Sequence, residues 1–220
     1  MTRFFSLLLL AALFVGCGGA EGTEVDATDA VDPEATQTEM KPSAVYNVDA
    51  SASVLNWEGA KPTGSSHTGT IPVQAGKIMV ADGNIVGGEF TLNIAGMTNT
   101  DLPADKAAKL LGHLKSGDFF ETEKFPTATF TITSVQPATG MEGITHKVSG
   151  NLMMKGQSKN ITIPTNVSMD GGMLKAAAPA FTIDRTEWGV VYNSGSLADV
   201  VKDNIINDEV GLELMLVAKK

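Results

Sequence analysis

The alternation of apolar and polar residues, repeated between turn signals, is the feature that most limits how this chain can fold. From Ile161 to Met169 every second residue is Ile, Thr, Val or Met, and the run ends at Asp170-Gly171-Gly172. Period two is typical of a strand with one buried face. Similar runs cover residues 54–57, 67–73, 77–80, 85–97, 128–132, 148–154, 174–183 and 210–216. Many short strands separated by turns favour an antiparallel barrel or sandwich.

One amphipathic segment and an aromatic corner interrupt the strands. Within residues 102–115, Leu110, Leu111 and Leu114 share one face at helical spacing, which predicts a helix. Directly after it, four of the chain's nine phenylalanines fall within residues 119–130. Two interpretations stay open. The rings plug the end of a packed core, which is the common role of buried phenylalanine, or they surround the mouth of an apolar cavity.

The N-terminal residues have the pattern of a secretory signal. Arg3 is followed by an uncharged apolar run of twelve residues, Phe4 to Val15, which is shorter than the roughly 20 residues that span a bilayer. Cys17, the only cysteine of the chain, ends the stretch Leu13-Phe14-Val15-Gly16-Cys17, which resembles a bacterial lipobox. We therefore expect residues 1–16 to be a lipoprotein signal peptide and Cys17 to be a lipid anchor. This predicts a bacterial envelope protein, on the periplasmic face or the cell surface, with the outer membrane favoured.

An acidic segment separates this anchor from the strands. Residues 18–44 contain seven acidic residues against Lys41 alone, and they contain no aromatic residue. Such a composition predicts a disordered linker over residues 17–44, which by random-coil scaling would hold the next domain roughly 30 Å from the membrane. The linker carries most of the net charge of −9. Residues 45–220 are therefore only mildly acidic and have no electrostatic footprint for nucleic acid.

The sequence contains no recognisable catalytic or metal-binding motif. His67, His113 and His146 lie far apart, without the short spacing or the cysteine partners of a zinc site. The G-x-S-x-G, P-loop and G-x-G-x-x-G signatures are absent. We therefore expect no enzyme, no metal and no cofactor.

A charged cluster of Asp184, Arg185 and Glu187 follows an apolar strand. Such a cluster is more often a salt-bridged strand end than an acid–base pair. A hydrolase that uses Asp184 and Glu187 is therefore the less favoured alternative to a binding protein.

A closed barrel of eight strands is the smallest common sheet that can hold a small ligand inside.

Several motifs, in a fixed order, resemble those of the YceI-like family. They are Tyr46-Asn47-Val48-Asp49, residues 113–120, residues 125–130, residues 150–152 with 155–159, and residues 183–189. The resemblance covers residues 45–220 almost end to end, as one domain. Trp188 stands where the family usually has Phe, and the loop at 193–207 is longer and more polar than is typical.

The resemblance implies an all-β fold with one helix, in the form of an extended, lipocalin-like antiparallel β-barrel with an internal apolar tunnel. It implies that the tunnel binds a polyisoprenoid or fatty-chain lipid, carried or stored at the envelope, and it implies no catalysis. Sequestration of amphiphilic toxins or fatty amides is the alternative, and a homodimer is left open. The candidate lining residues are Phe90, Leu92, Phe119, Phe120, Phe130, Leu152 and Trp188, with Arg185 near a polar head group.

Overall fold

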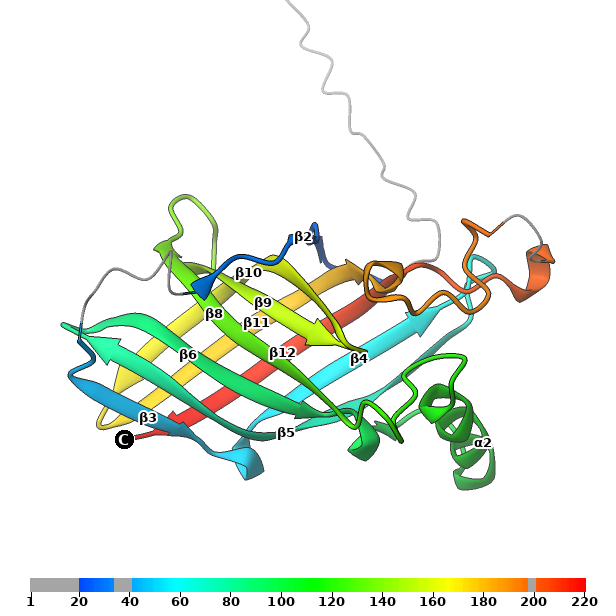
Figure 1. Ribbon diagram of the computed structural model, residues 1–220, viewed down its shortest axis with the longest axis horizontal. Coiled ribbons are helices and arrows are strands. Elements are labelled where there is room, and N and C mark those ends of the chain that lie inside the picture. Colours follow the sequence, from blue (N-terminus) through cyan, green and yellow to red (C-terminus); the bar gives the residue numbers. More distant parts are fainter. Residues whose placement is uncertain (1–19, 34–40, 198–200) are drawn as a thin grey trace, which may run out of the picture.

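The computed structural model describes residues 20–33, 41–197 and 201–220, and its central feature is a closed antiparallel barrel (Figure 1). Eight strand positions follow one another around the barrel, in the order β4-β5-β6-β8-β9-β10-β11-β12 and back to β4. β3 continues the position of β4 toward the other end, because it pairs with the same two neighbours, β12 and β5. The predicted all-β class and antiparallel barrel are thereby confirmed.

The elements have the following bounds. The strands are β1 (Thr23–Glu24), β2 (Thr28–Asp29), β3 (Ala44–Val48), β4 (Val54–Ala60), β5 (Ser66–Ala81), β6 (Asn84–Asn93), β7 (Thr98–Asn99), β8 (Thr127–Pro137), β9 (His146–Met154), β10 (Gln157–Asp170), β11 (Met173–Asp184) and β12 (Glu209–Lys219). The α-helix is α2 (Ala104–Lys115), and short 3-10 helices are η1 (Ala50–Ala52), η2 (Ile94–Gly96), η3 (Arg185–Trp188) and η4 (Lys202–Asn204).

The hairpins close in the gaps between the predicted strand runs, within residues 81–84 and 155–160. Asp82 and Gly83 join β5 to β6 with φ of 51° and 80°, and Lys155 and Gly156 join β9 to β10 with φ of 50° and 77°. Two consecutive positive φ values are the geometry of a type I′ turn, whose twist matches that of the strands it joins. The two strands predicted over 67–73 and 77–80 form one long strand, β5, because a register shift after Val73 lets the chain continue.

β10 and β11 separate along half of their length. Their ladder joins Asn166–Asp170 to Met173–Ala177 and ends there. Next in β11 comes an irregularity between Ala178 and Phe181, where Pro179 has no N–H to offer a neighbouring strand. Beyond this point the N-terminal residues fill the gap. β1 pairs in parallel with β11, and β2 pairs antiparallel with β10.

The prediction of a disordered linker over residues 17–44 is therefore wrong for residues 20–33, which we call the N-terminal strap. Val25 belongs to the buried core, and its N–H donates a 2.9 Å hydrogen bond to the carbonyl of Thr182. Val31 exchanges two hydrogen bonds, of 3.0 and 2.6 Å, with the side-chain amide of Asn151. The strap is ordered because two separating strands leave backbone groups that need partners.

Other N-terminal predictions fall on residues that the structure does not describe. The signal peptide over 1–16, the anchor Cys17 and residues 34–40 lie outside the described ranges. Among the residues that are described, no helix is both long and apolar enough to cross a membrane.

The helix α2 lies outside the barrel, at one end (Figure 1). Leu111 and Leu114 from the predicted stripe are half-buried and pack against the core. Pro103, whose fixed φ suits a helix start, precedes its first turn. The aromatic corner follows α2 and leads into β8, which brings Phe130 to an inward, buried position.

Candidate functional site

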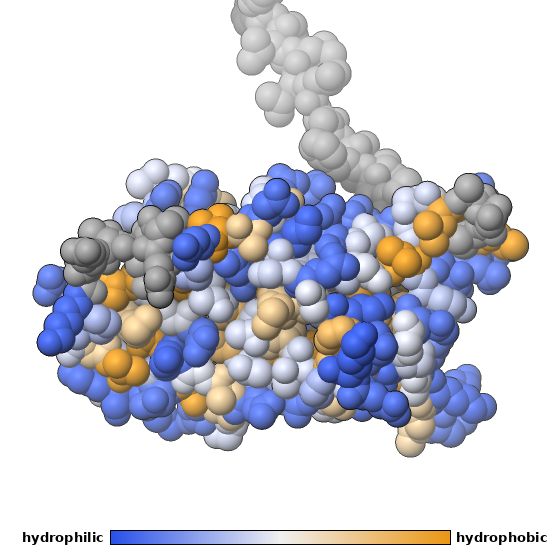
Figure 2. Space-filling view, in the orientation of Figure 1, coloured by the Kyte–Doolittle hydropathy of each residue, from blue (hydrophilic) through white to orange (hydrophobic). Residues whose placement is uncertain are grey.

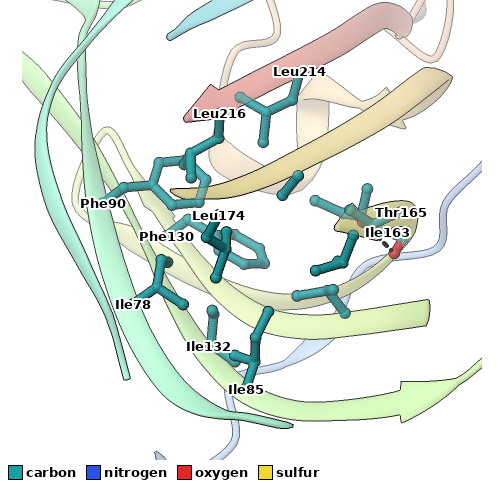
Figure 3. A pocket seen from close by; sticks show the side chains of 13 residues that line it. Ile78, Ile85, Phe90, Phe130, Ile132, Ile163, Thr165, Leu174, Leu214 and Leu216 are labelled. Carbon is teal, nitrogen blue, oxygen red and sulfur yellow. Dashed lines mark hydrogen bonds between the residues drawn. The ribbon is translucent and has the colours of Figure 1, made fainter. Parts of the chain in front are cut away.

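An apolar cavity lies inside the barrel (Figure 3). Ile78 and Ile85 flank the β5–β6 turn and Leu174 follows the β10–β11 turn, so the cavity lies toward the barrel end that holds these two turns. Its lining comes from seven strands and consists of Ile78, Ile85, Phe90, Phe130, Ile132, Val148, Ile163, Thr165, Val167, Leu174, Ala176, Leu214 and Leu216.

Thr165 is the one lining side chain with a polar atom, and that atom has a partner. Its hydroxyl donates a 3.1 Å hydrogen bond to the carbonyl of Ile163 (Figure 3). The cavity surface therefore offers hydrocarbon contact and no charged group. A surface of this kind suits an apolar chain and would disfavour a charged ligand, because burying an unpaired charge is costly.

Phe90 and Phe130 form the aromatic wall of the cavity. They face one another across the β6–β8 ladder, with ring centroids 5.3 Å apart and planes inclined by 30°. Gly150 on β9 leaves space for the Phe130 ring, since a Cβ at Gly150 would lie 2.3 Å from Phe130 Cζ. The position of the wall thus depends on a residue without a side chain in the next strand.

The free space is small in this structure. The cavity measures about 40 Å³, and a site that holds one water needs about 10–15 Å³. The barrel interior is thus close to filled by its own side chains. A long ligand fits inside only if lining side chains or strands move apart.

The structure divides the predicted lining residues into two groups. Phe90 and Phe130 line the cavity, whereas the other five do not. Leu92, Leu152 and Trp188 are buried in the core outside the cavity lining, and Phe120 is half-buried against that core. Phe119 packs instead against His113 and Tyr192 beside α2, with ring centroids 5.0 and 5.1 Å away.

The phenylalanines of the aromatic corner therefore lie in two different places. Its last ring, Phe130, reaches the cavity, while Phe119 takes part in a cluster at the barrel end. His113 connects this cluster to the segment after α2, because its Nε2 lies 2.9 Å from the carboxylate of Asp118. The His113 ring also meets the ring of Tyr192 edge-on, with centroids 4.8 Å apart. The interpretation as a plug describes Phe119 better than the interpretation as a cavity mouth.

The guanidinium of Arg185 donates hydrogen bonds to other groups of this chain. Its guanidinium donates to the carbonyls of Val190, Ile206 and Asn207 at 2.5, 3.1 and 3.0 Å, and to the carboxylate of Asp208 at 3.3 Å. Burial lowers the pKa of Arg185, and the nearby carboxylates of Asp208 and others oppose this shift. The side chain is 4% exposed, so it fastens the loop before β12 and does not line the cavity.

The carboxylates of the charged cluster also have separate partners. Asp184 caps η3 by accepting hydrogen bonds from the backbone N–H and the hydroxyl of Thr186, at 2.8 and 2.6 Å. Glu187 pairs with Lys159 at 3.1 Å. The geometry does not direct Asp184 and Glu187 toward a common point, as a hydrolase of the kind considered above would need.

The histidines are also apart in the fold. His67 pairs with Asp101 at 2.8 Å, and His146 bonds to Thr145 at 2.8 Å, while His113 belongs to the cluster beside α2. In the described ranges no three or more His, Cys, Asp or Glu residues are grouped so that they could hold a metal ion.

Sequence reasoning missed most of the lining. The missed residues are Ile78, Ile85, Ile132, Val148, Ile163, Thr165, Val167, Leu174, Ala176, Leu214 and Leu216. Most of them occupy positions that the period-two pattern marks as inward, but the pattern marks core and cavity positions alike. Proximity to the β5–β6 and β10–β11 turns distinguishes part of the lining, because the cavity lies near those hairpin ends.

Comparison with known protein sequences identifies a domain family. Residues 46–218 match the YceI-like domain family. A UPF0312 protein of Staphylococcus aureus (strain USA300) is 34% identical over 86 residues, which are 37% of this chain and 46% of that protein. The chain thus matches about half the length of these curated relatives.

Two solved structures have the same architecture at low sequence identity. Burkholderia cenocepacia BcnA superposes with a TM-score of 0.58 at 21% identity, covering 78% of this chain and 99% of the other. A polyisoprenoid binding domain from Saccharophagus degradans, implicated in plant cell wall breakdown, superposes with a TM-score of 0.60 at 21% identity, covering 81% and 99%. The resemblance of the ordered motifs is therefore confirmed over nearly the whole barrel, and the chain belongs to the YceI-like domain family.

Proposed function

We propose that this protein binds a long amphipathic lipid, of polyisoprenoid or fatty-chain type, inside the barrel, and that it carries or stores this lipid at the bacterial envelope. The observation that carries the proposal is the cavity with its apolar lining and its aromatic wall of Phe90 and Phe130. Further support comes from the Saccharophagus degradans neighbour, which is described as polyisoprenoid-binding and has the same fold.

The source of the lipid follows from the size of the hydrophobic effect. About thirty carbons, at roughly 0.8 kcal/mol each, would contribute about 24 kcal/mol on transfer from water, which exceeds the practical ceiling of about 18–21 kcal/mol. Transfer from a bilayer, where the tail is already in hydrocarbon, is close to neutral. The protein therefore exchanges its ligand with a membrane.

Attachment to that membrane is assigned to Cys17. The only cysteine of the chain directly follows the apolar run of the signal sequence. A lipid on Cys17 would keep the barrel beside its ligand source, on the periplasmic face or the cell surface.

The proposal is tested by asking whether the barrel retains a lipid. Residues 18–220, which include the strap, are made in a bacterial host and studied by native mass spectrometry and by organic extraction. We expect one long-chain lipid per chain. Its mass and head group also decide between an endogenous isoprenoid or fatty lipid and a captured foreign amphiphile, as the sequestration alternative requires.

Two neighbouring alanines provide a matched pair of variants. Ala176 lines the cavity, whereas Ala177 faces outward on the same strand. Ala176→Leu fills the free space and should reduce the bound lipid, while Ala177→Leu should leave the lipid unchanged. An empty wild-type chain, or equal lipid content in both variants, would contradict binding in this cavity.

A further inference from the structure

The loop between η3 and β12 presents apolar side chains to solvent. Val191, Leu197 and Val201 are 42%, 46% and 67% exposed. Residues 189–197 contain no charged side chain. Figure 1 shows this loop in orange at one end of the molecule. Hydrophobic surface is visible at the same end in Figure 2. We call Val191, Leu197 and Val201 the apolar end of the barrel.

These side chains are presented by a loop that is fastened to the barrel. The guanidinium of Arg185 holds the carbonyl of Val190, and the hydroxyl of Ser194, fully buried, donates a 2.8 Å hydrogen bond to Asp208. The N–H of Asn207 donates to the carbonyl of Ala60 at the end of β4. Hydrogen bonds therefore hold the loop to the barrel at Val190 and Ser194 on one side and at Asn207 on the other.

The N-terminal strap enters at the same end of the barrel. Ala20 lies against Gly211, since a Cβ built at Gly211 would be 2.9 Å from that of Ala20. Gly211 pairs with Glu58 of β4, two residues before Ala60, which binds the loop. The first described residue and the apolar end are thus attached to adjacent parts of β4 and β12.

The chain length between the anchor and the strap is short. Cys17 precedes Ala20 by three residues. Three Cα–Cα steps of 3.8 Å span at most about 11 Å. A lipid on Cys17 would therefore bring this end of the barrel against the bilayer, where a 27-residue random coil would hold it roughly 30 Å away.

We propose that the apolar end rests in the headgroup region of the bilayer, with Val191, Leu197 and Val201 as the contacting side chains. The proposal rests on the lipid anchor at Cys17 that is part of the proposed function. Residues 189–197 carry no charge, so this part of the loop loses little hydration on entering the interface and gains by the removal of apolar area from water, while Val201 is followed by the exposed Lys202 and Asp203. The short link between Cys17 and Ala20 would bring this surface to a membrane, whereas it would not bring a second copy of the chain to it.

The experiment uses the full lipidated chain with one added cysteine. In that chain the sulfur of Cys17 carries the lipid, so a cysteine introduced by Leu197→Cys or Val201→Cys is the only free thiol. The matched control is Val45→Cys, because Val45 is 44% exposed and lies on β3, at the opposite end of the barrel. Each variant is labelled with an environment-sensitive fluorophore and reconstituted into phosphatidylethanolamine–phosphatidylglycerol vesicles that contain a quencher on the acyl chains.

We expect the labels at 197 and 201 to shift to the blue and to be quenched, and the label at 45 to stay as it is in water. If all three labels report water in vesicle-bound protein, the chain is tethered without docking and the inference is wrong. If the labels at 197 and 201 are already shielded without vesicles in a concentration-dependent way, a second copy covers this surface and the inference is also wrong. If detergent partitioning finds no lipid on the chain, the anchor itself fails and the docking inference falls with it.

Discussion

The indole Nε1 of Trp188 donates a 2.8 Å hydrogen bond to the carbonyl of Leu152. Trp188 is fully buried, so η3 is fastened to β9 through the interior of the barrel. This contact closes the barrel at the end away from the β5–β6 and β10–β11 turns.

Replacing this indole should cost more than replacing the other one. Trp188→Phe removes the donor and leaves unfilled space, which should lower the free energy of unfolding by about 1–3 kcal/mol. Trp57→Phe is the control, because the 3.2 Å bond from Trp57 to the carbonyl of Thr98 is exposed. Urea unfolding of both variants measures the difference. Equal losses in the two variants would mean that the buried hydrogen bond of Trp188 adds nothing to the free energy of unfolding.

The N-terminal strap should contribute to stability through Val25. Val25→Asp places a carboxylate in the core, so we expect a loss of at least about 2 kcal/mol, or roughly 4–8 °C in Tm for a chain of this size. Ala30→Asp is the control, since Ala30 is exposed on the same segment. Thermal unfolding followed by circular dichroism provides the measurement. A strap that does not pack in solution would leave both variants at the wild-type Tm.

The space for the Phe130 ring should depend on Gly150. Gly150→Ala would place a Cβ 2.3 Å from Phe130 Cζ and 2.8 Å from the carbonyl of Thr131, and overpacking of this kind costs about 1–3 kcal/mol. Gly59→Ala on β4 is the matched control, because no atom lies within 4 Å of its Cβ. Chemical denaturation measures both. Adding Phe130→Leu to Gly150→Ala should recover part of the loss, and full additivity of the two changes would argue against the contact.

Asp101 should make stability depend on pH below neutrality. Partial burial raises its pKa, but hydrogen bonds from His67, Thr68 and Asn99 outweigh this effect and lower the pKa to about 2. A carboxyl with a lowered folded-state pKa stabilises the fold above its unfolded pKa, about 3.9, and this stabilisation is lost as the pH falls from about 4 to 2. Asp101→Asn should therefore destabilise the protein at pH 7 and much less at pH 2. Urea unfolding at both pH values measures this, and an equal loss of stability at pH 7 and at pH 2 would contradict it.

Membrane attachment should require Cys17. Cys17→Ser removes the sulfur that would carry the lipid and leaves every described residue unchanged. We expect the variant to move from the membrane fraction to the soluble fraction while its Tm stays the same. Detergent phase partitioning and thermal unfolding measure the two properties. Recovery of both proteins in the aqueous phase would remove the basis for the anchor.

Local patterns in the sequence determined the strands and turns of this protein. The alternation from Ile161 to Met169 decides which side chains of β10 share a face, because the side-chain period of a strand is two whatever lies beside it. Asp82, Gly83 and Gly156 suit the positive φ values of their turns, because glycine lacks a Cβ and aspartate tolerates the left-handed region. Together with the ordered motifs of the YceI-like family, these local properties were sufficient for the antiparallel barrel.

Contacts between distant residues decided the rest, and only the tertiary structure supplies them. Leu152 and Val148 are both inward on β9, yet only Val148 borders the cavity, because the neighbouring strands fill the space around Leu152. Arg185 is bound by carbonyls some twenty residues later in the chain. Val25 has a place in the core because β10 and β11 separate more than 130 residues later. Free volume and unpaired backbone groups are properties of several strands together, so no single stretch of sequence encodes them.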